Sequence, residues 1–267
     1  MIIVGERING TRKRIQEAII GRDAALIGQE AARQAEAGAD YLDVNAGTNP
    51  EREPEDLVWL VETVQGATEK PLCIDSPNPQ ALGAGLGAHR GQALVNSASA
   101  EEGRLGTVFA LAREHGARVV GLTLDDSGLP KTAEQRVEIA RRLAAAAEGA
   151  GVAREDLFID PLARAVGLEN EQGAAFLDAV AGIREALPGA HVICGLSNVS
   201  FQMPERRLLN MTFLAMAMSR GLDAAILDPL DAGIMAVACA GEALLGRDDM
   251  CMGYVKAYRA GRLKAAR

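Results

Sequence analysis

The sequence is poor in the residues that build metal centres and disulfide frameworks. It has four cysteines, and no two of them form the C-x-x-C pair found in zinc sites and redox motifs. Its three histidines stand before apolar runs or near the ends of helical segments: His89, His115 and His191. We therefore expect free cysteines, as in cytoplasmic proteins, and no metal or other cofactor held by the chain itself.

Further shortages argue against nucleic acid, sugar and membrane partners. Aromatic residues make up 3% of the chain, so there are few platforms on which bases or sugars could stack. The net charge of −8 opposes binding to a phosphate backbone. No apolar run approaches the length of a membrane span, and the first residues do not resemble a signal peptide. We expect a cytoplasmic protein that binds a small molecule.

The chain instead contains eight short apolar runs, and each of them ends on polar residues. They cover residues 2–4, 41–44, 72–74, 93–95, 119–122, 157–159, 191–194 and 224–227. Runs of this length are typical of buried parallel strands. The seventh run continues as Gly-Leu-Ser-Asn-Val-Ser over residues 195–200, which places hydroxyl and amide groups at the end of a strand. In parallel α/β proteins, ligands bind at that end.

Segments with helical periodicity separate these runs. Residues 55–64 carry apolar side chains at helical spacing, and Thr132 can cap a later helix. The eightfold alternation, without a break in composition, predicts a single-domain TIM (β/α)8 barrel over residues 1–267, with residues 251–267 as a C-terminal tail. An open doubly wound sheet is less favoured, because the glycines of residues 83–87 lie in a helical stretch and lack the G-x-G-x-x-G pattern.

The polar residues at the strand ends predict a ligand with several N–H donors. Asp75, Asn96 and Asp160 end the third, fourth and sixth runs, so a barrel would bring them to one mouth. Two carboxylates and an amide match the pyrimidine edge of a pterin, which offers an amino group and a ring N–H beside a carbonyl. Each aspartate could also be a turn or cap residue. A glycosidase would need paired carboxylates too, but the scarcity of aromatics speaks against it.

Several motifs resemble those of the pterin-binding methyltransferases. The resemblance rests on residues 5–10 (Gly-Glu-Arg-Ile-Asn-Gly), 72–76 (Leu-Cys-Ile-Asp-Ser), 96–97 (Asn-Ser), 160–161 (Asp-Pro), 195–201 (Gly-Leu-Ser-Asn-Val-Ser-Phe) and 212–217 (Thr-Phe-Leu-Ala-Met-Ala). It covers nearly the whole chain. The chain is similar to the methyltetrahydrofolate:corrinoid/iron–sulfur protein methyltransferases and to the folate module of cobalamin-dependent methionine synthase.

The resemblance implies a homodimeric barrel that binds methyltetrahydrofolate or tetrahydrofolate, and a corrinoid (cobalamin) carried by a separate protein. It implies substrate contacts from Asp75, Asn96, Asp160, Gly195, Ser197, Asn198 and Arg206, with Glu6, Asp43, Gln202 and Leu227 as further contacts. Within this set, Asn198 is the implied catalytic residue, close to N5 of the folate. An amide is no strong acid, so we expect it to stabilise charge at N5 while solvent supplies the proton.

Two other functions stay open from the sequence. Dihydropteroate synthases have the same fold and grip a pterin, but they open with a different Asn-x-Thr motif and carry a late Ser-Arg-Lys sequence. A folate-binding protein without catalysis would need the same pocket. The sequence also leaves open whether the methyl group moves from folate to corrinoid or in the reverse direction.

Overall fold

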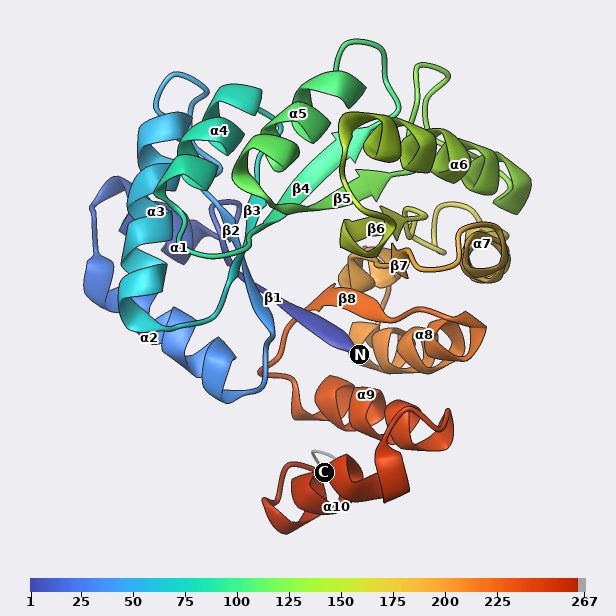
Figure 1. Cartoon of the computed structure of the whole chain (residues 1–267). Coiled ribbons are helices and arrows are strands. Elements are labelled where there is room, and N and C mark those ends of the chain that lie inside the picture. Colours follow the sequence, from blue (N-terminus) through green and yellow to red (C-terminus); the bar gives the residue numbers. More distant parts are fainter. Residues whose placement is uncertain (264–267) are drawn as a thin grey trace.

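The computed structural model describes residues 1–263, which form a barrel of eight parallel strands surrounded by helices (Figure 1). The strands are β1 (Ile2–Asn9), β2 (Tyr41–Asn45), β3 (Leu72–Asp75), β4 (Leu94–Ser99), β5 (Arg118–Leu122), β6 (Leu157–Asp160), β7 (His191–Val192) and β8 (Ala224–Leu227). Consecutive strands pair from β1 to β7, and β8 pairs with β1. A parallel bridge between Gly195 and Ile226 joins the segment after β7 to β8. The predicted TIM barrel is confirmed.

Helices connect the strands and cover the outside of the barrel. They are α1 (Lys13–Ile20), α2 (Ala24–Glu36), α3 (Glu53–Ala67), α4 (Pro79–Ala88), α5 (Leu105–His115), α6 (Ala133–Ala150), α7 (Gln172–Ala186), α8 (Arg206–Arg220), α9 (Ala232–Leu244) and α10 (Met252–Arg259). The capping box expected at Thr132 is present, because its side chain and that of Gln135 each accept from the other's backbone N–H. The glycines of residues 83–87 lie inside α4, where a Cβ on Gly85 would come within 3.1 Å of Ile74.

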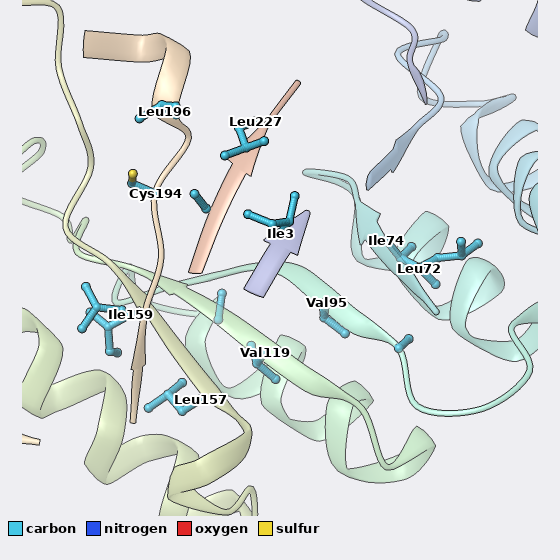
Figure 2. Packing of buried hydrophobic residues seen from close by; sticks show 14 of the residues in the cluster. Ile3, Leu72, Ile74, Val95, Val119, Leu157, Ile159, Cys194, Leu196 and Leu227 are labelled. Carbon is cyan, nitrogen blue, oxygen red and sulfur yellow. The ribbon is translucent and has the colours of Figure 1, made fainter. Parts of the chain in front are cut away.

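Alternation along the strands creates two separate apolar cores. Inside the barrel, one buried residue from each strand or its continuation contributes to a cluster: Val4, Tyr41, Cys73, Leu94, Val120, Phe158, Ile193 and Ala224. The neighbouring positions point outward and pack under the helices, as Figure 2 shows for residues such as Ile74, Val119 and Leu227. Because successive side chains point to opposite faces, the next inward position beyond the inner cluster faces the barrel mouth.

The seventh strand is shorter than the sequence predicts. Only His191 and Val192 are strand residues, and the Asp223 side chain contacts both of them. Its carboxylate accepts from the Val192 N–H at 2.8 Å and lies 3.0 Å from Nδ1 of His191. The chain then continues through Gly195 into a 3-10 helix, η2 (Leu196–Ser200). The short strand is therefore followed by a turn that lies at the barrel mouth.

The described part of the predicted tail contains a helix. Helix α10 lies next to α9 and falls within the predicted tail of residues 251–267, whose last four residues lie outside the described part (Figure 1). Across residues 1–263, no helix combines the length and the apolar composition needed to cross a membrane.

Candidate active site

A cavity of about 300 Å³ opens at the carboxyl ends of the strands. It is lined by Glu6, Asn9, Thr11, Arg12, Asp43, Asp75, Asn96, Gly195, Ser197, Asn198 and Ile226. The side-chain alternation of the strands explains this set: Asp43, for example, follows the inward-facing Tyr41 by two residues and therefore points into the same barrel, one layer higher. The inner cluster closes the barrel below, and a polar layer lies above it.

Two carboxyl groups lie deep in this layer without a cation beside them. Asn45 Nδ2 donates to Asp75 Oδ2 at 2.9 Å, whereas the buried Oδ1 of Asp43 has no hydrogen-bond partner among residues 1–263. Burial raises the pKa of Asp43 well above its usual range, and the Asp75 carboxylate raises it further. Burial also raises the pKa of Asp75 to about 6, although the Asn45 hydrogen bond opposes this. Such a pair suits a ligand that brings its own N–H donors.

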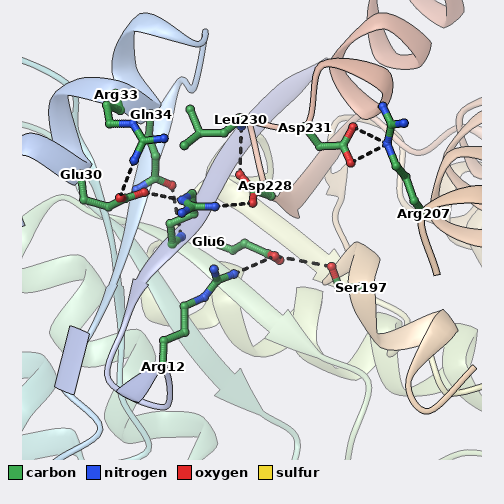
Figure 3. A network of polar contacts seen from close by, with 11 residues as sticks. Glu6, Arg12, Glu30, Arg33, Gln34, Ser197, Arg207, Asp228, Leu230 and Asp231 are labelled. Carbon is green, nitrogen blue, oxygen red and sulfur yellow. Dashed lines mark hydrogen bonds and ion pairs between the residues drawn. The ribbon is translucent and has the colours of Figure 1, made fainter. Parts of the chain in front are cut away.

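Glu6 joins two walls of the cavity (Figure 3). Its Oε1 lies 3.2 Å from Nη2 of Arg12 and accepts a 3.5 Å hydrogen bond from the Ser197 hydroxyl. Burial raises the pKa of Glu6, and the Arg12 guanidinium partly offsets that rise. The contact connects the end of β1 with the loop that follows β7.

Asp160 is buried and does not line the cavity. Its side chain is 6% exposed and is not among the lining groups. Its Oδ1 accepts from the Leu162 N–H at 2.7 Å, and burial raises its pKa to about 7, while hydrogen bonds from the Leu162 and Gly195 backbone lower it. The Asp160 carboxyl thus adjoins Gly195, which does line the cavity.

Helix η2 places Ser197 and Asn198 at the rim. A Cβ on Gly195 would lie 2.9 Å from Nδ2 of Asn198, so only glycine lets this amide rest against the strand end. Arg206, which was expected to bind the ligand, instead donates to the Ser197 carbonyl at 2.8 Å and to the Ser200 hydroxyl at 3.1 Å. Its side chain does not line the cavity, and its contacts hold the loop that carries Asn198.

Two predicted contacts lie elsewhere. Leu227 is fully buried in the outer core, because it is the residue of β8 that points toward the helices (Figure 2). The side chain of its neighbour Ile226 points to the opposite face of the strand and lines the cavity. Gln202 is exposed beyond η2, with a positive φ of 61°, and is also absent from the lining. Leu227 and Gln202 therefore do not line this cavity.

Several lining residues were missing from the predicted set. Asn9, Thr11 and Arg12 come from the end of β1 and the turn after it, where Asn9 Oδ1 accepts from both the backbone N–H and the hydroxyl of Thr11. The Gly-Glu-Arg-Ile-Asn-Gly motif pointed to this turn but not to the residues beyond it. Ile226 could have been found from strand parity, since it alternates with Leu227.

No metal site accompanies the cavity in the part of the chain that the structure describes: no three His, Cys, Asp or Glu side chains gather around a common point there. All four cysteines are free, and Cys251 is exposed rather than buried. Cys73 lies inside the barrel near Asp43. Burial raises the pKa of this thiol well above its usual range, so it is held in the protonated form.

Comparison with known proteins gives a relative that matches nearly the full length of the chain. The chain is 40% identical over 265 residues to the methylcorrinoid:tetrahydrofolate methyltransferase of Eubacterium limosum, which covers 98% of both chains. It is 32% identical over 239 residues to the methionine synthase of Mycobacterium tuberculosis, and this match covers 85% of the chain but 20% of that longer protein.

Solved structures share the fold at low sequence identity. A Xanthomonas albilineans dihydropteroate synthase with 4-aminobenzoic acid has a TM-score of 0.72 at 21% identity, covering 91% of this chain and 92% of its own. A Yersinia pestis DHPS with a pterine–sulfa conjugate has a TM-score of 0.70 at 17% identity, covering 92% and 93%. The model of the pterin binding enzymes matches residues 5–228, a span that includes every residue lining the cavity. The chain belongs to the pterin binding enzyme family.

Proposed function

We propose that this chain transfers a methyl group between tetrahydrofolate and the cobalt of a corrinoid carried by a partner protein. The observation that carries the proposal is the acidic and amide-lined cavity, in a chain similar over nearly its whole length to the Eubacterium limosum enzyme. From that relative's name, we infer the direction from methylcorrinoid to tetrahydrofolate. The same site serves the reverse direction, because binding of the folate and charge at N5 are common to both.

The strand ends would hold the pterin by its pyrimidine edge. The Asp75 and Asp43 carboxylates accept from the amino group and ring N–H, and the Asn96 amide can donate to one ring atom and accept from another. Asp160, whose carboxyl is hydrogen-bonded to the backbone of the lining residue Gly195, would add a further acceptor to this edge. These contacts would supply the partners that the buried Asp43 Oδ1 lacks in the free protein.

The proposed methyl transfer takes place at N5 of the folate, which would face the rim of the cavity. In the proposed direction, the N5 lone pair forms the bond to the methyl carbon, and both electrons of the Co–C bond stay on cobalt, which leaves Co(I). N5 becomes positively charged and then loses its proton to solvent. The Asn198 side chain is exposed at the rim, where its carbonyl oxygen can stabilise that charge without acting as an acid or base.

We further propose that the chain acts as one pterin-binding domain over residues 1–267, with residues 251–267 as its tail, and that it forms a homodimer in the cytoplasm. An apolar groove of about 250 Å³ between α7 and α8 supports the dimer, since Leu209, Phe213 and Met216 line it and the nearby Leu208 is 64% exposed. The free cysteines suit a reducing compartment.

Two alternatives receive less support. The likeness to dihydropteroate synthases is below 25% identity and concerns the barrel alone. A folate carrier would share the cavity but would show no turnover.

The deciding experiment is a methyl-transfer assay with the purified chain. We expect methylcobalamin and tetrahydrofolate to give cob(I)alamin and methyltetrahydrofolate, followed by the cobalamin absorbance under anaerobic conditions. Asp75→Ala and Asn96→Ala should each weaken folate binding by roughly 1.5–3 kcal/mol in calorimetry, because each leaves a charged or polar partner unpaired. Folate binding without any turnover would instead identify a carrier, and unchanged affinity in both variants would remove the pterin site.

A further inference from the structure

A second cavity, of about 170 Å³, lies between α1 and α2 beside the barrel mouth. Four arginines line it, together with the single acidic residue Glu30: Arg7, Arg12, Arg14 and Arg33. The chain as a whole has a net charge of −8, so this concentration of positive charge contrasts with the rest of the protein. We call this cavity the arginine cleft.

The acidic groups near the cleft do not neutralise it. Arg7 pairs with Glu30 and, at 2.7 Å, with Asp228, which belongs to the neighbouring strand end (Figure 3). Arg33 lies 3.4 Å from the same Glu30. Arg14 is exposed, and no carboxylate among residues 1–263 lies within ion-pair distance of it. Glu30 is therefore shared between two arginines, and positive charge is left over for an anion.

Arg12 connects the arginine cleft with the candidate active site. It lines both cavities, and its guanidinium reaches the active-site residue Glu6. On the opposite rim, Ser197 and Asn198 are neutral, and one arginine, Arg206, donates to the Ser197 carbonyl and the Ser200 hydroxyl. A folate whose pterin fills the barrel mouth has its anionic groups at the other end of the molecule. That end meets the greatest positive charge if it leaves the cavity past Arg12.

We propose that the arginine cleft binds the carboxylates of the glutamyl chain of the folate, so that the protein prefers folates with several glutamyl residues. This inference rests on the proposed function. Arginine forms bidentate hydrogen bonds with carboxylates, and each added glutamyl residue brings one more carboxylate along the cleft. The arginines are partly exposed, so the preference is set by charge and weakens as salt screens it.

Calorimetric titration with two probes tests the inference: tetrahydrofolate with one glutamyl residue and with three. We expect the triglutamate to bind the unaltered protein about tenfold more tightly at low ionic strength, because several partly exposed ion pairs add up. The double variant Arg14→Gln/Arg33→Gln should lose this preference, because its affinity for the triglutamate should fall much more than its affinity for the monoglutamate, whose carboxylates still meet Arg7 and Arg12. The control variant Arg141→Gln/Arg220→Gln removes the same charge from α6 and α8, far from the cleft, and should keep the preference.

The outcomes separate this inference from the proposed function. If the unaltered protein binds both folates equally, the inference is overturned while the proposed function stands. If it binds neither, the proposed function fails and the inference fails with it. If the double variant keeps the preference but exchanges methyl groups more slowly with the corrinoid protein alone, the cleft docks that partner and the inference is likewise overturned.

Discussion

Replacing Asp160 by asparagine should make the free protein more stable, and more so at higher pH. The Asp160 carboxyl is 6% exposed, and burial raises its pKa to about 7 from an ordinary value of 3.8. Folding therefore disfavours the charged form. The stability that the protonated form provides is fully present below pH 3.8 and is lost as the pH rises through 7. Asparagine keeps an oxygen that can accept from the Leu162 N–H but carries no charge.

The size of the effect follows from the shift. One pKa unit corresponds to about 1.36 kcal/mol. Between pH 5 and pH 8 the unfolded chain stays ionised at this residue, while the folded protein gives up its proton only near pH 7. The difference in unfolding free energy between Asp160→Asn and the unaltered protein should therefore grow by about 3 kcal/mol over this range. Any change in unfolding free energy that the asparagine amide itself causes does not depend on pH. It therefore cancels when the difference at pH 5 is compared with the difference at pH 8.

Urea unfolding at pH 5, 6, 7 and 8 measures the change directly. Asp178→Asn is the control, because Asp178 is an exposed carboxylate on α7 and its removal should leave the difference nearly constant. A difference for Asp160→Asn that does not vary with pH would refute the reasoning, since the carboxyl would then ionise equally in both states. The same variant should bind folate less tightly, by roughly 1.5–3 kcal/mol, if Asp160 contacts the pterin.

Three further predictions concern the cavity and its support. Asn198→Ala should lower the single-turnover rate at saturating folate by about 10²–10³, because it removes a group aimed at charge on N5; a folded variant with a normal saturated rate would speak against this role. Folate affinity should fall as the pH drops below about 6, where Asp75 binds a proton that the ligand must displace, and this dependence should flatten in Asp75→Asn. Arg136→Leu should cost at least about 2 kcal/mol in urea unfolding, because the buried guanidinium donates at 2.7 Å both to the Pro161 carbonyl and to Gln172; an unchanged midpoint would contradict it.

The sequence predicts the barrel well because its signals are local. Short apolar runs bounded by polar residues mark strands, and caps such as Thr132 mark helix starts, so both can be read from a few neighbouring residues. Helix α1 was not expected, although its buried Ile15, Ala18 and Ile19 give it an amphipathic pattern. The early end of β7 has no such local signal, since the apolar run continues through Ile193 and Cys194.

The site was predicted in outline, and the errors follow from what a sequence leaves out. Asp75 ends β3 and Asn96 lies within β4, both on inward positions, so their place on the cavity follows from alternation. Leu227 was predicted as a contact, but it points toward the helices, and its neighbour Ile226 lines the cavity. Arg206 follows the Ser-Asn motif as expected, but which groups its long side chain reaches depends on tertiary structure.

The energetics of the site link its stability to its function. Asp43 and Asp75 lie close together in a buried layer, Asp43 Oδ1 has no partner within residues 1–263, and burial raises the pKa of Asp160. Each feature costs free energy in the unliganded barrel, and each is relieved by a ligand that donates hydrogen bonds to carboxylates. Substitutions that neutralise these groups should therefore stabilise the free protein and weaken folate binding together. A purely structural role for the three aspartates predicts the reverse for stability, because removing groups that support the fold destabilises it.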